Sequence, residues 1–112
     1  MEVRAIAKDL GVSARKVRLV IDLVRGKKVD EALVLLKFTR TPTARFVAKV
    51  IKSAAANAEN NFQMSPSDLR IVKVFADEAR TFKRYRARSR GQASPILKRN
   101  SHITVVVAEQ ES

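Results

Sequence analysis

The chain has 112 residues, of which 46% are hydrophobic and 5% aromatic, and its 23 basic and 11 acidic residues give a formal net charge of +12 at pH 7. The absence of cysteine excludes disulfides, cysteine-ligated zinc and thiol catalysis, and the single histidine, His102, excludes a histidine cluster. The length predicts one domain over residues 1–112, with a modest core of aliphatic side chains. Because this charge excess opposes compactness unless a polyanion relieves it, we expect a nucleic-acid partner, with a membrane surface as the weaker candidate.

Targeting signals and membrane spans are not expected. No apolar run approaches the roughly 18 residues that a membrane span requires. The N-terminal segment "MEVRAIAKDLG" has no apolar signal core, and its acidic residues argue against a transit peptide. We therefore expect the protein to stay in the compartment where it is made, the cytoplasm.

The first predicted elements are a strand and a helix. Residues Glu2 to Lys8 alternate weakly between apolar and polar side chains, which favours a short strand. Ser13 is a good N-cap for a helix, and Gly26 is placed to end that helix in the left-handed conformation. Hydrophobic residues at helical spacing give it one apolar face, made of Val17, Val20, Ile21 and Val24. The cations that lie off this face or follow the helix are Arg15, Lys16, Arg18, Arg25, Lys27 and Lys28.

Two more helices are predicted in the next part of the chain. Asp30 is expected to cap the second helix, with Val29 before it as a hydrophobic staple. Thr41 is expected to cap the third, with Pro42 at its first position, where the missing N–H costs nothing. The third helix is the longest, and its apolar face is made of Val47, Val50, Ile51, Ala54 and Ala58. We interpret its run of small residues, 54–58, as close packing on a neighbouring element, with close approach to RNA as the alternative.

Two later segments are rich in β-branched residues and are predicted as strands, Leu69–Ala76 and His102–Ala108. In the second segment the alternation of side chains places Ile103, Val105 and Val107 on one face. Because no helix separates the two segments, we expect them to pair as antiparallel strands.

Between Ala76 and Ser101 lie 24 residues, 77–100, which we call the arm, whereas hairpin loops usually have about two to five. Eight of the residues 80–100 are Lys or Arg and none is acidic. Such a segment is either a disordered basic loop or a ribbon that continues the flanking strands outward by roughly 40 Å. Its midpoint falls near Ser89 and Arg90, beside Gly91, which suits a turn. We therefore predict an α+β fold, with three helices packed on a small antiparallel three-stranded sheet and a long protruding β-hairpin.

Arginine recurs at every second position from residue 84 to residue 90 of the arm, at Arg84, Arg86, Arg88 and Arg90. On a strand these positions line one face, and guanidinium groups bind phosphate oxygens in a bidentate fork. The pattern therefore predicts phosphate contact. Sequence-specific base reading is not expected, because Phe82 and Tyr85 are the only aromatic residues of the arm available for stacking.

The inventory of reactive residues argues against an enzyme. His102 lies in a predicted strand, and we interpret it as a packed or hydrogen-bonded residue. Asp77 and Glu78 are adjacent, so on a strand they face opposite sides and balance charge at the base of the arm instead of forming an acid–base pair. We expect no catalytic residue, no metal site and no cofactor.

Four segments resemble the bacterial large-subunit ribosomal protein twenty-two family: "SARKVRLVIDLVRGKKVDEAL", "KVIKSAAANAENN", "ARSRGQ" and "KRNSHITVVV". The resemblance covers essentially the whole chain. It implies a small α+β body on the outer surface of the large ribosomal subunit, near the end of the peptide exit tunnel. It also implies a hairpin that reaches inward through rRNA and lines part of the tunnel wall. The implied partners are several domains of the large-subunit rRNA, neighbouring ribosomal proteins and the nascent polypeptide, and the implied role includes assembly.

Position by position, the resemblance assigns rRNA binding to the basic first helix and to both sides of the hairpin. The matching residues are Arg15, Lys16, Arg18, Lys27, Lys28, Lys83, Arg84, Arg88, Arg90, Gly91, Gln92, Lys98, Arg99 and His102. Arg25 and Arg86, which lie among them, complete the predicted rRNA-binding set. The predicted tunnel-lining tip comprises Arg88, Ser89, Arg90, Gly91 and Gln92.

Two other function classes remain open from the residues alone. A free-standing nucleic-acid-binding module would use the first helix as a basic recognition helix. A cationic membrane-surface peptide would concentrate its charge on one amphipathic helix. Here the densest charge lies in an extended arm instead, which argues against the membrane peptide.

Overall fold

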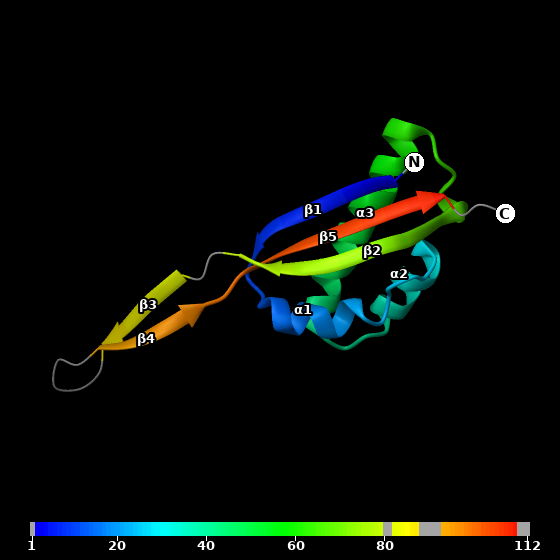
Figure 1. Ribbon diagram of the computed structural model, residues 1–112. Helices are drawn as coiled ribbons and strands as arrows, with labels where there is room; N and C mark the ends of the chain where they lie inside the picture. The colour runs from blue at the N-terminus through cyan, green and yellow to red at the C-terminus, as the bar shows by residue number, and fades with distance from the viewer. Residues whose placement is uncertain (1, 80–81, 88–92, 110–112) are drawn as a thin grey trace.

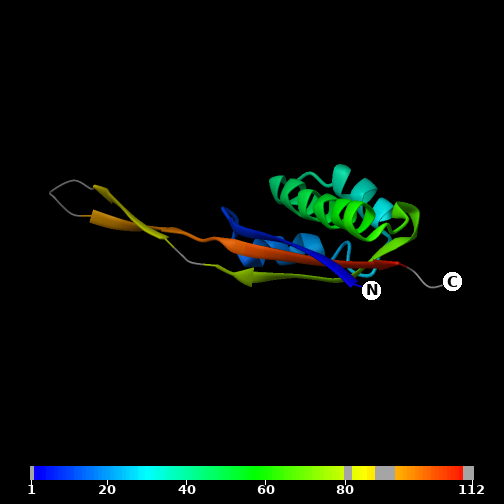
Figure 2. The same ribbon diagram turned by 90° about the horizontal axis from the view of Figure 1, so that it is seen from above.

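A computed structural model describes residues 2–79, 82–87 and 93–109 of the chain. Three helices cover one face of a three-stranded sheet, and a two-stranded hairpin projects from one end of that sheet (Figure 1, Figure 2). The predicted α+β fold is confirmed. In chain order the elements are β1 (Glu2–Leu10), α1 (Ala14–Ile21), α2 (Val29–Lys37), α3 (Pro42–Phe62), a 3-10 turn (Pro66–Asp68), β2 (Leu69–Glu78), β3 (Phe82–Ala87), β4 (Ala93–Lys98) and β5 (Ser101–Glu109).

The sheet has the strand order β1-β5-β2, and both neighbours pair antiparallel with the central strand β5. Val105 lies opposite Ala5 on one side and opposite Val74 on the other. Ile103, Val105 and Val107, which were predicted to share one face of β5, are fully buried. β1 and β2 are therefore edge strands, and no other strand among the described residues pairs with the outer edge of either.

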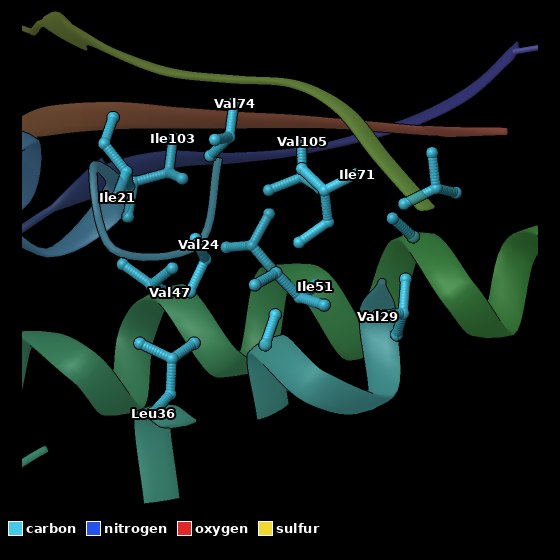
Figure 3. Close-up of a cluster of buried hydrophobic side chains, with 14 of the residues drawn as sticks. Ile21, Val24, Val29, Leu36, Val47, Ile51, Ile71, Val74, Ile103 and Val105 are labelled. Atoms are coloured by element: carbon cyan, nitrogen blue, oxygen red, sulfur yellow. The ribbon is translucent and has the colours of Figure 1, made fainter. Parts of the chain in front are cut away.

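The core lies between the sheet and the helices (Figure 3). α3 packs on β1 and β5, and α1 packs on β2. Figure 3 shows Ile21 and Ile51 pointing toward the valine and isoleucine side chains of the sheet. Ala54 and Ala58 of α3 are also fully buried, so the packing interpretation of the small residues is confirmed at these two positions. Among the described residues, no helix is both long and apolar enough to cross a membrane.

The ends of α1 follow local chemistry. Ser13 is the N-cap, as predicted, and its hydroxyl accepts a bond from the backbone N–H of Lys16 at 3.5 Å. The α-helix ends at Ile21, earlier than predicted, and residues 22–26 continue as turns in which the N–H of Val24 donates to the carbonyl of Ile21 at 3.1 Å. Gly26 then takes a φ of 81°, which confirms the predicted left-handed residue.

The predicted start of α2 is wrong by two residues. The N-cap is Lys28 and not Asp30, which falls in the first turn of the helix. Two tertiary constraints fix this start: Lys28 pairs as a bridge with Arg70, and Val29 is buried. The acidic Asp30 still stabilises the helix, because it lies at the positive end of the helix dipole. For α3 the predicted Thr41 N-cap and Pro42 at the first turn are confirmed, although the Thr41 side chain makes no capping bond.

The hairpin continues the sheet outward. The N–H of Ala79 donates to the carbonyl of Asn100 at 3.0 Å, just beyond the last pair of β2 and β5. β3 and β4 then pair antiparallel from Phe82 with Lys98 to Ala87 with Ala93. The chain measures 67 × 26 × 17 Å, and its radius of gyration is 17.1 Å, whereas a compact domain of this length would have about 13 Å. The predicted projecting ribbon is confirmed for these two strands, and its predicted tip, residues 88–92, lies outside the described residues.

Candidate nucleic-acid interface

Two predicted rRNA-binding arginines are anchored on the free edge of β2. The guanidinium of Arg18 donates to the carbonyl of Ala76 at 3.0 Å, and that of Arg25 donates to the carbonyl of Val74 at 3.0 Å. β2 is an edge strand, so within residues 2–79, 82–87 and 93–109 no further strand bonds these carbonyls. Side chains that cover such an edge protect it from pairing with other chains. Each guanidinium has five N–H donors, so both arginines keep donors for a ligand.

The segment after Gly26 extends along the same edge. The N–H of Ile71 donates to the carbonyl of Lys27 at 2.9 Å, and Lys28 pairs with Arg70. As the residue number rises from 18 to 28, the β2 residue that each one bonds or pairs with falls from 76 to 70. The segment therefore runs antiparallel to β2 and places its cations in one row. We call this row, together with the cations at the start of α1, the basic edge: Arg15, Lys16, Arg18, Arg25, Lys27 and Lys28.

The basic edge keeps most of its charge available. All six residues are exposed. Arg25 forms an ion pair with Asp22 at 2.6 Å, but the two side chains are 52% and 62% exposed, and such pairs are worth at most about 1 kcal/mol. The other five make no ion pair with any residue in the described ranges. The basic edge can therefore bind a polyanion without first giving up a strong internal partner.

The basic edge starts near the hairpin. Figure 1 shows α1 beginning at the end of the sheet from which β3 and β4 project. The structure thus brings the predicted first-helix cations to one rim of the body, with the hairpin leaving from one end of that rim. Sequence reasoning did not include Arg70, whose exposed position beside Lys28 adds a further cation at the far end. The alternation of apolar and polar residues in "LRIVKV" places Arg70 on the outward face of the strand, and this pattern could have identified it.

The hairpin carries the second group of predicted residues. Lys83, Arg84 and Arg86 lie on β3, opposite residues 97, 96 and 94 of β4. Arg84 and Arg86 occupy alternate positions, as the period of two predicts. Lys98 lies opposite Phe82 at the base of the hairpin, and Arg99, which follows it, is exposed. The predicted tip residues, Arg88, Ser89, Arg90, Gly91 and Gln92, lie outside the described residues.

The remaining candidates do not assemble a reactive centre. His102 lies within β5, is half-buried and faces Asp77 in the register of β2 and β5. Asp77 and Glu78 are both exposed at the end of β2. In the part of the chain that the structure covers, no three His, Cys, Asp or Glu side chains gather in a way that could hold a metal ion. What the arrangement offers chemically is an extended cationic surface suited to binding a polyanion.

Known proteins match the chain over nearly its full length. The profile of the family described as "Ribosomal protein L22p/L17e" matches residues 5–108. The chain is similar to the "Large ribosomal subunit protein uL22" of Dehalococcoides mccartyi, with 69% identity over 109 residues that cover 97% of this chain and 100% of the relative. The proteins of the same name from Pediococcus pentosaceus and Halothermothrix orenii are 56% and 54% identical, over 96% and 99% of this chain and 92% and 98% of the relatives. The resemblance seen in the sequence motifs is thus confirmed, and the chain belongs to the L22p/L17e family of ribosomal proteins.

Proposed function

We propose that this protein is a structural component of the large ribosomal subunit in the bacterial cytoplasm. It binds large-subunit rRNA through phosphate contacts, assists assembly, and lines part of the nascent-peptide exit tunnel with its β3–β4 hairpin. The names of the relatives, each a large ribosomal subunit protein, support the first part of the proposal. Its further partners are neighbouring ribosomal proteins and the nascent polypeptide, and it uses no cofactor.

The observation that carries the proposal is the projecting, acid-free hairpin. Residues 80–100 contain eight cations and no acidic residue, and β3 and β4 extend this segment away from the body. A two-stranded ribbon has no core of its own, and its like charges repel one another. Phosphates on several sides would neutralise this charge. A folded RNA that surrounds the hairpin supplies phosphates in that arrangement, whereas a flat membrane or a single duplex face would leave part of the hairpin without counter-charge.

The basic edge supports binding by the body. The hydrogen bonds from the guanidinium groups of Arg18 and Arg25 to carbonyls of β2 hold these side chains in place before RNA binds. Less side-chain entropy is therefore lost on binding. Lys27 and Lys28 are held by backbone pairing to β2. Contacts of this kind position the protein on phosphates and do not read sequence.

The alternative of a free-standing module with α1 as a recognition helix finds less support. α1 has only eight residues, and it packs on β2 with Arg18 bonded to the carbonyl of Ala76. A recognition helix must instead enter a groove of the nucleic acid with its polar face free.

Co-sedimentation tests the ribosomal role. The protein should remain with the large subunit at high salt, because the hairpin is enclosed by RNA, whereas a free module should be released. Binding of the isolated protein to deproteinised large-subunit rRNA should weaken steeply with salt, since counterion release drives it. Release at high salt, or an affinity that does not change with salt, would contradict the proposal.

The tunnel role has its own test, which the absence of cysteine makes possible. In the variant Ser89→Cys the only thiol lies at the predicted tip. This variant should crosslink to a stalled nascent polypeptide that carries one cysteine, whereas the control Ser67→Cys, which places the thiol in the exposed turn before β2, should not. Equal crosslinking of both variants, or none from the tip, would exclude the tunnel assignment.

A further inference from the structure

A groove between α2 and α3 is lined by cations that belong to neither the basic edge nor the hairpin. It encloses about 870 Å³, and its walls come from α2, α3 and the linker between them. Figure 2 shows α2 beside α3 in the helix layer. Its floor is made of apolar and small side chains, among them Leu36 and Ala44, which are buried, and Ala48, which is half-buried. Four cations surround it: Lys37, Arg40, Arg45 and Lys52.

The charge of the groove is not neutralised within the protein. No acidic residue lines it. All four cations are exposed, and none makes an ion pair or a side-chain hydrogen bond with a residue in the described ranges. By contrast, Arg25 in the basic edge bonds both a carboxylate and a backbone carbonyl. The groove is therefore a site of like charges held together by the packing of α2 on α3, and an anionic ligand would relieve their repulsion.

The spacing of the cations favours a polymer over a small anion. Arg45 and Lys52 are seven residues apart on α3, which corresponds to about 10 Å along the helix axis. Lys37 and Arg40 add charge at the end of α2 and in the linker. A single phosphate cannot contact cations spread over this length. A nucleic-acid backbone can, because each strand of a duplex carries a charge about every 3.4 Å of helix axis.

We infer that the α2–α3 groove binds the phosphate backbone of a segment of large-subunit rRNA, separate from the segments that bind the basic edge and the hairpin. This inference rests on the proposed rRNA-binding function and adds a third contact surface to it. RNA is favoured over a protein segment because four cations without an acidic residue would demand an unusually acidic peptide. The half-buried Ala48 leaves room for the backbone of the RNA to approach α3.

A pair of double variants tests the groove. Arg45→Gln with Lys52→Gln removes two groove cations, whereas Lys49→Gln with Lys73→Gln removes two exposed cations that do not line it. Binding of each full-length variant to deproteinised large-subunit rRNA is measured from low to high salt. For the groove variant the slope of log K against log salt should fall in magnitude by roughly 1.4 to 1.8, which is the loss of two phosphate contacts. For the control variant the slope should fall by less than half of this amount. Circular dichroism should show that both variants are folded.

Protection of a single thiol identifies the occupant. Thr41→Cys places the only thiol at the rim of the groove, and Ser67→Cys is the matched exposed control away from it. When the protein binds protein-free rRNA, the reaction of the Thr41→Cys thiol with a bulky maleimide should become at least tenfold slower. The reaction rate of the control thiol should change less. Protection that appears only in the assembled subunit would assign the groove to a neighbouring protein and overturn the inference, as would no protection at all.

The two proposals fail in different ways. If the unmodified protein does not bind large-subunit rRNA, the proposed function itself is wrong. If it binds and the groove variant keeps the affinity and the salt slope of the unmodified protein, the proposed function stands and the groove assignment is wrong. The same conclusion follows if the control variant loses as much as the groove variant.

Discussion

The body and the hairpin of this protein both contain antiparallel strands, but different interactions stabilise them. In the body, β2 and β5 bury Ile71 and Val105 against a helix layer, so the sheet is stabilised by its own core. In the hairpin, no helix of the described chain covers β3 and β4. Residues 79–100, which contain these two strands, include no acidic residue. The comparison shows that the body is stabilised by buried apolar surface. We expect the hairpin, in contrast, to depend on a partner of opposite charge for its stability.

The largest expected effect comes from the core of the body. Ile51→Ala removes a fully buried side chain between α3 and the sheet, and such truncations lower the free energy of unfolding by about 2–5 kcal/mol. Denaturant unfolding monitored by circular dichroism measures the change. The control Leu19→Ala, at a position that is 71% exposed, should change the free energy of unfolding by less than about 0.5 kcal/mol. Equal losses for both variants would mean that the packing shown in Figure 3 does not stabilise the body.

The next largest effect on stability is expected for the two arginines of the basic edge that bond carbonyls of β2. The double variant Arg18→Ala with Arg25→Ala loses two bonds to backbone carbonyls of β2, each worth about 1 kcal/mol of unfolding free energy, and the exposed ion pair of Arg25 with Asp22. The variant Arg15→Ala with Lys16→Ala removes the same charge without these bonds and should leave the free energy of unfolding nearly unchanged. If the two variants unfold at the same denaturant concentration, the anchoring bonds contribute nothing to stability.

A smaller effect is expected where the backbone turns into the basic edge. Gly26→Ala forces a side chain into the left-handed conformation at φ 81°, which costs about 1–2 kcal/mol, although a Cβ at this position meets no neighbouring atom. Gly11→Ala is the control, because Gly11 has no positive φ and its Cβ is also unobstructed. Thermal unfolding of both variants measures the difference. A cost at Gly11 equal to that at Gly26 would rule out backbone conformation as the cause.

The smallest effect on stability is expected in the hairpin. The core of the body is built from its sheet and helices, so replacing Arg84, Arg88 and Arg90 together with alanine should change the free energy of unfolding of the body by less than about 0.5 kcal/mol. Binding to large-subunit rRNA should nevertheless weaken, and its salt slope should fall by roughly 2 to 3 as three phosphate contacts are lost. Unfolding of the body in this variant would show that the hairpin belongs to the core, which would remove the distinction between the two regions.

The parts of the fold that depend on local chemistry could be predicted from the sequence. Ser13, Gly26 and Pro42 take their predicted places because capping, a positive φ and the missing N–H of proline act within a few residues. The predicted N-cap at Asp30 is wrong because pairing of Lys28 with Arg70, which is remote in sequence, starts the helix earlier. The exclusion of catalysis from the residue inventory is confirmed, since the L22p/L17e family consists of ribosomal structural proteins.

The candidate site was predictable in composition and less so in arrangement. The cations of the first helix and of the hairpin stand out because they are dense along the sequence. The anchoring of Arg18 and Arg25 could not be predicted, because it depends on which strand lies at the sheet edge beside α1. Arg45 and Lys52 were missed for a related reason, since only the packing of α2 on α3 brings them into one groove with the cations of the linker.

Hydrogen exchange of the backbone amides, measured on the free protein and on its complex with large-subunit rRNA, tests the central claim most directly. In the free protein the amides of β5 should be protected by the stability of the body, whereas those of β3 and β4 should exchange much faster, because a two-stranded hairpin without a core is marginally stable. Binding of rRNA should slow exchange in β3 and β4 by at least tenfold. Equal protection of β3 and β5 in the free protein, or no added protection on binding, would contradict the account.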